Sequence, residues 1–385
     1  MRIVQVTLRF DAPGGVETTV RETSRRLHDA GEDVQVFASD LYDEGRWEVR
    51  SNFPPVVDGV PVRRFRVRKR MIPGLTMPGM IGLIDALRVA APDVIHAHSH
   101  RYGHVLQSAA VAERRGIPLV ISTHYHPADR RASASKRGLL RLQDVGFGAT
   151  AYRVARALVV ETEFEARLVR EFAPADRIRI VPPGIDLAGW TTAGNDPPAP
   201  AELPRDYLLF VGRVAPNKGL PTLLGAVARL DPSARPAIVL MGQDWGERAR
   251  LESQARSLGI ASDVRFLGHV VDPGVYRAVV RGARALVLPS EYEAFGLVLL
   301  EAMAARTPIV ASAVGGVQEV VEQGRLGRLV PYGDVEALST ALRSVGDDPQ
   351  ETRRRVNAAA ERVRDYDWRV TTERLRAVYR ELVRG

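Results

Sequence analysis

Two basic residues on one glycine-flanked segment could bind an anionic group. Arg213 and Lys218 are five residues apart and follow a predicted strand at 207–211. A guanidinium binds phosphate oxygens in a bidentate manner, and an ammonium acts as a mobile point charge. The chain has three lysines against 51 arginines, so a lysine at this position is suggestive. The segment predicts a phosphate site, and a solvated surface loop is the alternative.

Two glutamates with seven residues between them, Glu293 and Glu301, follow a predicted strand at 285–288. We expect a helix to begin near Leu297, with Glu301 about one turn into it. Gly296 lets the amides at the helix start face a ligand, which suits a diphosphate. Because Glu301 lies in an apolar stretch, where a carboxylate without a partner is costly, we expect it to meet a hydroxyl pair such as that of a ribose. The alternative is a helix whose glutamates are only solvated.

A glycine pair, Gly14 and Gly15, follows the first predicted strand at 3–6. Glycine lets the backbone approach a ligand closely, and the start of the next helix offers unpaired N–H groups to an anion. The fingerprint G-x-G-x-x-G is not present here, which argues against an NAD or FAD dehydrogenase. A plain turn between strand and helix is the alternative.

Six of the eight histidines lie between positions 96 and 126. His96, His98 and His100 alternate at the end of a predicted strand, which would place their imidazoles on one side, as in a metal site. Asp93 and Asp129 are the only carboxylates near them in the sequence. A metal site and an ordinary polar role therefore both remain open at this point.

Short β-branched runs alternate with longer amphipathic stretches along the chain, a pattern typical of βαβ units in an open parallel sheet. A proline-rich stretch at 191–206 separates the two halves and predicts an interdomain linker. We expect an α/β protein with two doubly wound domains that face each other across a cleft, with ligands at the carboxyl ends of the strands. The predicted strands are 3–6, 34–38, 60–66, 94–97, 119–122, 158–160 and 178–181 in the first half, and 207–211, 238–241, 264–267, 285–288, 309–311 and 328–330 in the second.

The composition is typical of a soluble globular protein, and 385 residues are enough for two cores. The chain has no cysteine, which excludes disulfides, a thiolate nucleophile and Cys-ligated metal centres. We identify neither a signal peptide nor an apolar stretch long enough to span a membrane, and we expect a cytoplasmic protein.

The net charge of +8 is concentrated in one run, since six cations lie in Arg63–Arg70. The uncharged stretch 71–84 follows directly. Such a run predicts either contact with an anionic membrane surface, which would place the protein peripherally on the inner face of the membrane, or the charged side of an edge strand. Both interpretations remain open.

The glutamate pair, with Phe295, Gly296 and Leu297 between its members, closely resembles the signature of retaining GT-B glycosyltransferases of family 4. The resemblance covers nearly the whole chain and includes the phosphatidylinositol mannosyltransferases. Pro183 departs from the family pattern, which usually has asparagine there. The family's GGV, GR, KG and PNG[IV]D elements correspond to Gly14-Gly15-Val16, Gly212-Arg213, Lys218-Gly219 and Pro182-Pro183-Gly184-Ile185-Asp186.

The resemblance implies transfer of a hexose from a UDP- or GDP-sugar to a hydroxyl of a lipid, glycan or small-molecule acceptor, with retention of configuration and with no metal or other cofactor. Arg213 and Lys218 would neutralise the donor diphosphate. Glu293 would hold the transferred sugar, and Glu301 would bind the ribose. Gly15 would let the acceptor domain close on the phosphates. The backbone N–H groups near the sugar would come from Phe295, Gly296 and Leu297.

The resemblance also implies a division of labour along the chain. Residues 1–187 would bind the acceptor, residues 188–364 would bind the nucleotide-sugar, and a terminal helix at 365–385 would cross back to the first domain.

Acceptor-side residues follow from the same resemblance. His124 matches a histidine that faces the transferred sugar in relatives, so we expect a catalytic or positioning role for it, ahead of an ordinary polar contact or a metal ligand. His98 and Tyr125 are further acceptor-side candidates, and no metal ligand is assigned.

Two other functions are weighed against this one. The same fold serves sugar phosphorylases and sugar-phosphate synthases, which would use inorganic phosphate or a phosphosugar. The basic charge alone would suit a nucleic-acid-binding protein, but no RNA or DNA module is recognisable, and aromatic residues are not interleaved with the basic runs. We therefore expect no nucleic-acid partner.

Overall fold

The structure is a computed structural model, and the chain folds into two compact units. Unit 1 comprises Met1–Pro183 and Trp368–Gly385, and unit 2 comprises Gly184–Asp367. Lys69, Arg70 and Asp129, together with part of the predicted linker, lie outside the described residues. The structure describes residues 1–12, 14–44, 47–68, 71–72, 75–127, 133–191 and 196–384.

Unit 1 is built on an eight-stranded sheet in the order β14-β13-β12-β11-β1-β2-β6-β5. All neighbouring pairs are parallel except β5 and β6. The chain leaves β1 on one side toward β2 and later returns on the other side with β11, so the carboxyl ends of β1 and β11 form a topological switch point, where ligands bind in such sheets. The strands are β1 (Arg2–Thr7), β2 (Asp33–Ser39), β5 (Val56–Val57), β6 (Val60–Phe65), β11 (Val94–His98), β12 (Leu119–Ser122), β13 (Ala157–Val160) and β14 (Ile178–Ile180).

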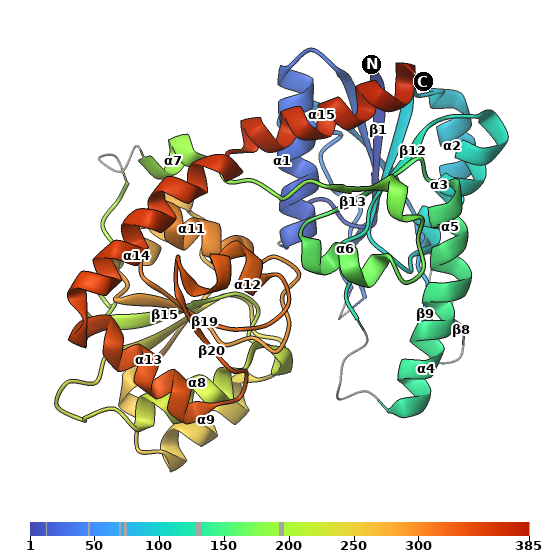
Figure 1. Ribbon diagram of the computed structural model, residues 1–385. Coiled ribbons are helices and arrows are strands. Elements are labelled where there is room, and N and C mark those ends of the chain that lie inside the picture. The colour runs from blue at the N-terminus through green and yellow to red at the C-terminus, as the bar shows by residue number, and fades with distance from the viewer. Residues whose placement is uncertain are drawn as a thin grey trace. The chain divides into compact units, whose positions relative to one another are not determined.

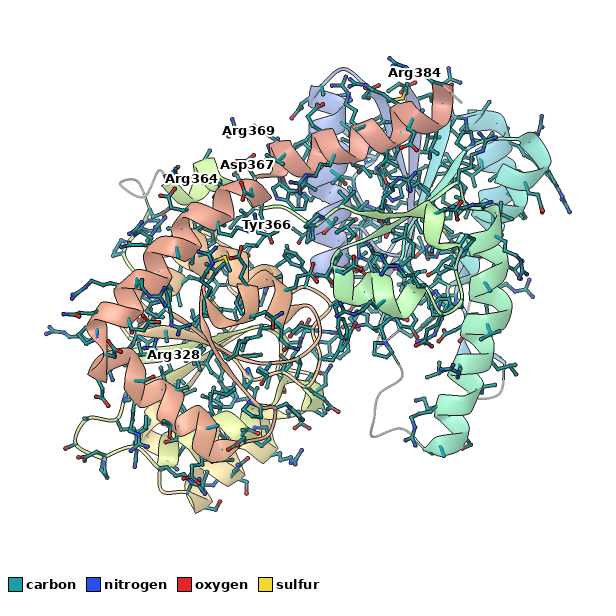
Figure 2. The ribbon with its side chains drawn as sticks, viewed as in Figure 1. Arg328, Arg364, Tyr366, Asp367, Arg369 and Arg384 are labelled. Atoms are coloured by element: carbon teal, nitrogen blue, oxygen red, sulfur yellow. The ribbon has the colours of Figure 1, made fainter. Side chains whose placement is uncertain are left out.

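The last helix of the chain belongs to unit 1. Helix α15 (Trp368–Arg384) lies alongside α1 (Gly15–Asp29) (Figure 1). Its buried side chains Leu375, Val378 and Tyr379 join the core that covers one face of the sheet. The chain passes from unit 2 to unit 1 between Asp367 and Trp368, and Asp367 is labelled in Figure 2. This face of unit 1 is therefore completed by residues that are far from it in the sequence.

The remaining elements of unit 1 cover the sheet or form short ribbons. The helices are α2 (Leu83–Ala90), α3 (Gly103–Arg115), α4 (Ala134–Gln143), the π-helix η1 (Asp144–Gly148), α5 (Ala149–Val154), α6 (Glu163–Val169) and the 3-10 turn η2 (Ala175–Arg177). The short strands are β3 (Leu41–Asp43), β4 (Glu48–Val49), β7 (Val67–Arg68), β8 (Met71–Ile72), β9 (Leu75–Thr76) and β10 (Gly79–Met80).

Unit 2 is built on a six-stranded parallel sheet in the order β17-β16-β15-β18-β19-β20. Its central strands are apolar and buried, as expected for a parallel sheet covered on both faces. The strands are β15 (Tyr207–Val211), β16 (Ala237–Met241), β17 (Val264–Gly268), β18 (Ala285–Leu288), β19 (Ile309–Ser312) and β20 (Arg328–Val330). The helices are α7 (Leu187–Thr191), η4 (Pro216–Lys218), α8 (Leu220–Ala228), α9 (Arg248–Ser257), η5 (Ala261–Asp263), α10 (Pro273–Gly282), α11 (Leu297–Ala305), α12 (Val317–Val320), η6 (Glu322–Gly324), α13 (Val335–Asp347), α14 (Pro349–Arg362) and η7 (Val363–Tyr366).

The predicted α/β fold class, with two Rossmann-like parallel sheets, is confirmed. Every predicted strand is present, and each observed end lies within one residue of the predicted one. The short strands β3, β4, β5, β7, β8, β9 and β10 were not predicted, because strands of two or three residues carry no periodic signal.

The basic run begins on the edge of the unit 1 sheet. Strand β5 pairs only with Val60 and Pro61 of β6, so the part from Arg63 to Phe65 pairs with β2 alone. This agrees with the edge-strand interpretation. Among the described residues, no helix combines the length and the apolar character needed to cross a bilayer.

Candidate active site

Three loops at the carboxyl edge of the unit 2 sheet are held together by their backbones. Gly219, after β15, has φ +64°, and a Cβ there would lie 1.9 Å from the carbonyl oxygen of Pro289, after β18. Gly315, after β19, has φ +52°, and its Cβ would lie 2.0 Å from the carbonyl oxygen of Glu293. Because both positions need left-handed backbone and no Cβ, only glycine fits. The loops form a frame around Lys218 and Glu293.

Lys218 and Glu293 form an ion pair inside this frame. Lys218 Nζ donates to Glu293 Oε1 at 2.6 Å, and the Ser290 hydroxyl donates to the same oxygen at 2.7 Å. The two charged side chains are 12% and 16% exposed. They are therefore largely removed from bulk water, where charge interactions are weak, but still open to a ligand. The structure thus brings together two residues that the sequence places in separate motifs.

Arg213 is exposed and lies over the indole of Trp245, with 4.4 Å between its Cζ and the ring centroid. A guanidinium over an indole face is attracted by the ring quadrupole. Trp245 is itself 38% exposed and is fixed through its backbone N–H, which donates to Val214 O at 2.9 Å. Sequence reasoning missed Trp245. An aromatic residue in the loop directly after β16 was the available signal.

Glu301 lies in the second turn of α11 and accepts a hydrogen bond from the hydroxyl of Tyr276 in α10. Burial raises the pKa of Glu301 to about 6, and the bond from Tyr276 opposes the rise. The carboxylate therefore has a partner, and the sequence argument required one. The partner in the structure is Tyr276, which sequence reasoning did not identify.

The segment before α11 has a buried part and an accessible part. Phe295 is buried, and its ring packs edge-on against Tyr366 with 5.7 Å between the centroids. Gly296 has φ +87°, and Leu297 is the first helical residue. Within the described part of the chain, no side chain caps this helix start. Its first N–H groups are therefore suited to an anion.

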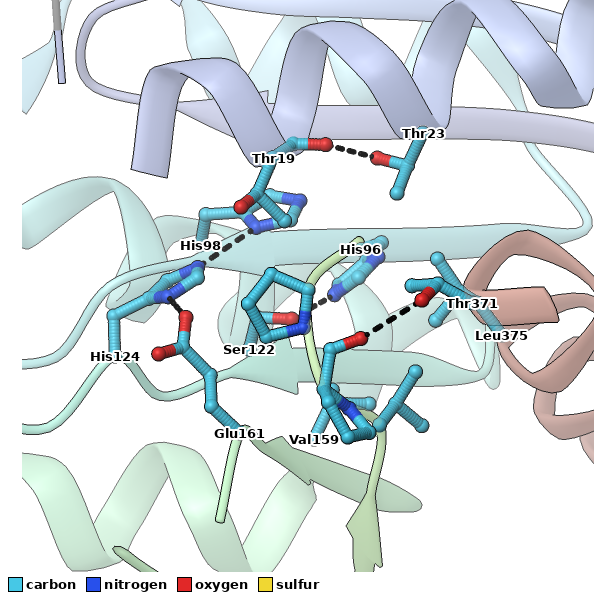
Figure 3. Close-up of a pocket in the computed structure, with 13 residues that line it drawn as sticks. Thr19, Thr23, His96, His98, Ser122, His124, Val159, Glu161, Thr371 and Leu375 are labelled. Carbon is cyan, nitrogen blue, oxygen red and sulfur yellow. Dashed lines mark hydrogen bonds and ion pairs between the residues drawn. The ribbon is translucent and has the colours of Figure 1, made fainter. Parts of the chain in front are cut away.

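A continuous chain of hydrogen bonds runs through buried and partly buried polar residues at the carboxyl edge of the unit 1 sheet. Figure 3 shows five of its members, namely His96, His98, Ser122, His124 and Glu161. It begins at Glu161, whose Oε1 lies 2.9 Å from His124 Nδ1. His124 Nε2 lies 3.4 Å from His98 Nδ1, and His98 Nε2 lies 2.7 Å from Gln5 Oε1. Both ring nitrogens of His124 and of His98 are therefore engaged within unit 1.

The hydrogen-bond chain continues to the C-terminal helix α15. Gln5 Nε2 donates to the hydroxyl of Tyr379 in α15 at 3.2 Å, and that hydroxyl lies 2.6 Å from His96 Nδ1. His96 Nε2 lies 2.8 Å from the Ser122 hydroxyl. A cavity of about 20 Å³, enough for about one water molecule, is lined by several of these residues.

The backbone around His124 is strained and held in place by a buried carboxylate. His124 has φ +41°, a left-handed conformation that costs a residue with a Cβ about 1–3 kcal/mol. The next backbone N–H, that of Tyr125, donates to Glu165 Oε1 at 2.7 Å, and the N–H of Glu161 donates to Glu165 Oε2 at 2.7 Å. Glu165 therefore fixes both ends of the His124–Glu161 pair.

The three histidines of this hydrogen-bond chain differ in charge. Burial lowers the pKa of His96 to about 3 and holds the pKa of His98 well below its usual value, so both rings are neutral at pH 7. Burial acts in the same direction on His124, but the hydrogen bond and charge of Glu161 outweigh it and raise the pKa of His124. The site thus has one histidine that favours a positive charge.

His100 belongs to a separate cluster. Its ring nitrogens lie 2.6 Å from the hydroxyl of Tyr152 and 2.8 Å from Asp144 Oδ1. Asp144 also accepts from the Tyr125 hydroxyl at 3.0 Å and pairs with Arg101. Across the described ranges, no three His, Asp or Glu side chains are arranged to hold a metal ion.

The predicted site residues fall into two groups. Unit 1 holds Gly15, His98, His124 and Tyr125, and of these Gly15 is the exposed first residue of α1. Unit 2 holds Arg213, Lys218, Glu293, Phe295, Gly296, Leu297 and Glu301. In unit 1, sequence reasoning missed Gln5, Glu161 and Tyr379. Their signal was a polar residue within, or directly after, a strand or helix stripe that is otherwise apolar.

Two protein families match the two halves of the chain. Glycosyltransferase Family 4 matches residues 13–188, and Glycosyl transferases group 1 matches residues 196–363. D-inositol 3-phosphate glycosyltransferase 1 of Catenulispora acidiphila is 33% identical over 97% of this chain and 92% of its own length. The chain is a family 4 glycosyltransferase. The resemblance predicted from the glutamate motif is confirmed.

A further relative supports the family, and similar solved structures support the fold. A glycogen synthase of Mycobacterium tuberculosis is 36% identical to this chain, and the match covers 76% of this chain and 70% of the synthase. The sucrose-phosphate synthase structure from Thermosynechococcus elongatus has a TM-score of 0.75 and 24% identity over 99% of both chains. The structure of Anabaena HepE in complex with UDP has a TM-score of 0.76 and 19% identity, and the match covers 99% of this chain and 100% of HepE. At these identities the structures show the GT-B fold.

Proposed function

We propose that this glycosyltransferase moves a hexose from a UDP- or GDP-sugar to an acceptor hydroxyl, with retention of configuration and without a metal ion. The observation that carries the proposal is the Lys218–Glu293 pair, with 2.6 Å between Nζ and Oε1 at the carboxyl edge of the unit 2 sheet. A cation beside a carboxylate provides a charge for the donor phosphate next to an acceptor for sugar hydroxyls.

The donor is bound by groups of unit 2. Lys218 and Arg213 neutralise the diphosphate, together with the first N–H groups of α11, and this electrostatic stabilisation makes the diphosphate a better leaving group. Protein cations thus supply the charge that a metal would otherwise supply. Glu301 accepts hydrogen bonds from the ribose hydroxyls, and Glu293 accepts them from the hexose.

Retention follows from attack on the face that the leaving group departs from. The bond between the anomeric carbon and the diphosphate oxygen breaks, and a bond to the acceptor oxygen forms on the same face. The acceptor proton passes to the departing diphosphate oxygen. The transition state carries positive charge on the sugar and growing negative charge on the diphosphate, which Arg213 and Lys218 stabilise.

The acceptor class is suggested by relatives that cover most of the chain. D-inositol 3-phosphate glycosyltransferases match 95–97% of it, which favours a phosphorylated polyol over a glucan or a lipid. An acceptor panel of D-inositol 3-phosphate, maltooligosaccharide, a sugar phosphate and inorganic phosphate separates these choices. Turnover with inorganic phosphate alone would instead indicate a phosphorylase.

Donor and metal are tested in one assay. Purified enzyme is mixed with the acceptor panel and with UDP-, GDP- or ADP-sugars, in the presence and absence of EDTA, and release of nucleoside diphosphate is measured. We expect one UDP- or GDP-sugar to be used at a rate that EDTA does not change, and the product to keep the donor's anomeric configuration by NMR.

The site residues are tested by substitution. We expect Lys218→Ala and Glu293→Gln each to lower kcat by at least about 100-fold, because each removes a charge that acts on the transition state. Arg250→Ala, which removes an exposed arginine of α9, is the matched control and should leave kcat unchanged. Circular dichroism checks that the variants are folded. Near-normal kcat in both site variants would refute the assignment.

We also propose that the exposed cations of the basic run, Arg63, Arg66 and Arg68, contact an anionic membrane surface. Co-sedimentation with vesicles tests this. Binding to anionic but not zwitterionic vesicles, weakened by salt and by the Arg66→Glu/Arg68→Glu variant, is the expected result. Equal recovery in the supernatant with both vesicle types would leave the edge-strand role alone.

A further inference from the structure

With the Gln5 amide oriented as in the structure, each bond of the unit 1 hydrogen-bond chain has one direction of donation. Gln5 Oε1 is an acceptor only, so His98 Nε2 carries a proton and donates to it. His98 is neutral and has a single ring proton, so its Nδ1 accepts from His124 Nε2. His124 Nδ1 donates to Glu161 Oε1. With a proton on each ring nitrogen, His124 is an imidazolium.

The other half of the chain has the same direction. The Gln5 amide donates to the oxygen of the Tyr379 hydroxyl, which leaves that hydroxyl's proton for His96 Nδ1. Neutral His96 then carries its proton on Nε2 and donates to the Ser122 hydroxyl. Each bond from Ser122 to Glu161 thus has one donor and one acceptor.

A flipped Gln5 amide would reverse every bond of the hydrogen-bond chain except the one from His124 Nδ1 to Glu161, because a carboxylate accepts in both cases. Its nitrogen would then donate to His98 Nε2, His98 Nδ1 would donate to His124 Nε2, and His124 would keep only the proton on Nδ1. Both directions satisfy the buried polar atoms, so the chain is a two-state element. The carboxylate of Glu161 favours the direction in which His124 is charged.

We propose that Tyr379, from the C-terminal helix, is a positioning residue that holds His124 as an imidazolium through Gln5 and His98. Tyr379 is fully buried, and among the described residues its hydroxyl is the hydrogen-bonding group that joins Gln5 to His96. An imidazolium whose two N–H groups both donate has no lone pair for a proton. His124 therefore acts through its charge and not as a base, a consequence that rests on the proposed function.

The charged and titratable groups around the chain favour this state. His124 is surrounded by the carboxyl groups of Glu161, Glu165 and Glu17, of which Glu17 pairs with Arg9. His98 also faces His104 of α3, whose Nε2 lies 2.8 Å from the carbonyl oxygen of His98. The carboxylates of Glu161 and Glu17 stabilise a proton on His124, and Glu165 contributes less because burial raises its pKa to about 7. The neighbours of His98 are other histidines.

The test is nitrogen NMR of histidine side chains in the full-length protein, with signals assigned by single His→Gln variants. At pH 7 we expect both ring nitrogens of His124 to be protonated, and His96 and His98 to be neutral with the proton on Nε2. In Tyr379→Phe, which keeps the ring and removes the hydroxyl, His98 should show both tautomers, and His124 should lose its second proton at lower pH than in the wild type.

Tyr207→Phe is the matched control. It also removes a buried tyrosine hydroxyl, which donates to Val279 O at 2.6 Å in unit 2, and it should leave the His124 titration unchanged. A neutral His124 in the wild type at pH 7, or an identical His124 titration in folded Tyr379→Phe, would overturn the proposal.

If Tyr379→Phe does not fold, Gln5→Met breaks the same link at a similar side-chain volume. It should also lower the pH at which His124 loses its second proton, and an unchanged titration would overturn the proposal. None of these measurements needs a donor or an acceptor. A failed transferase assay and a failed NMR test are therefore distinguishable.

Discussion

The residues of unit 2 that we propose to bind the donor already have partners within the protein. Lys218 is paired with Glu293, Arg213 lies over Trp245, and Glu301 is bonded to Tyr276. A ligand therefore competes with these contacts or adds to them. These partners already restrict the side-chain rotamers, so less conformational entropy is lost when a ligand binds.

The raised pKa of Glu301 predicts a pH dependence of donor binding. Ribose hydroxyls donate to a carboxylate, so binding requires the ionised form, and the free protein with a Glu301 pKa of about 6 must release a proton below that pH. We expect the Kd of the nucleoside diphosphate to rise by about fourfold from pH 7.5 to pH 5.5. Calorimetric titration at the two pH values measures it.

The contribution of Glu301 to the stability of the fold changes with pH in the opposite direction to its contribution to donor binding. Because the folded-state pKa of Glu301 exceeds the unfolded value, this group stabilises the fold at low pH, and that contribution disappears as the pH rises through about 6. Glu301→Gln should bind nucleotide more weakly at both pH values and lose the dependence. An unchanged dependence in this variant would assign the proton to another group.

At the scale of elements, the site is made where strands end. Parallel strands bring their carboxyl ends to one edge of the sheet, so loops that are distant in the sequence meet there. Spacing in the sequence identified the loops after β15 and β18. The contact of the loop after β19 with Glu293 was not predictable, because it depends on the close approach of two backbones at Gly315.

Gly219 offers a test of that frame. In Gly219→Ala the new Cβ would clash with a carbonyl oxygen, whereas in the control Gly259→Ala, with φ +70°, nothing lies within 4 Å. We expect about 1–2 kcal/mol of destabilisation in the control from left-handed backbone alone. Gly219→Ala should cost at least about 2 kcal/mol more, measured by urea unfolding, and should raise the donor KM. Equal costs would contradict the frame.

At the scale of the whole molecule, the two units have separate cores. The apolar cluster of unit 2 extends from Ile185 to Tyr366, and those of unit 1 include the C-terminal Leu375 and Tyr379. Each unit therefore buries its own apolar surface and can unfold as a cooperative body.

Separate cores predict two calorimetric transitions. A saturating nucleoside diphosphate should raise the midpoint temperature of only the transition that belongs to unit 2. At 100 times its Kd the ligand should stabilise that unit by about 2.7 kcal/mol. The matched variant Glu301→Gln should show a smaller shift at the same concentration, and Tyr379→Phe should change only the other transition. A nucleotide shift of the transition that Tyr379→Phe changes would contradict this assignment.

The sequence by itself determined nearly all elements of the two sheets, and it predicts the chemistry of the proposed donor motif. Periodicity located every strand of the two sheets except the two-residue β5, and the charges at Arg213, Lys218, Glu293 and Glu301 indicated a diphosphate and a hydroxyl ligand, because these inferences depend on residue type and local spacing.

Only the tertiary structure decided which residues partner one another. Tyr379 is 374 residues from Gln5, yet their side chains share a hydrogen bond, and Trp245 and Tyr276 reach Arg213 and Glu301 across separate loops and helices. Such contacts are set by how the elements pack, and no local pattern encodes them. The charge of His124 depends on the whole chain of partners, so it could be inferred only after the fold had brought them together.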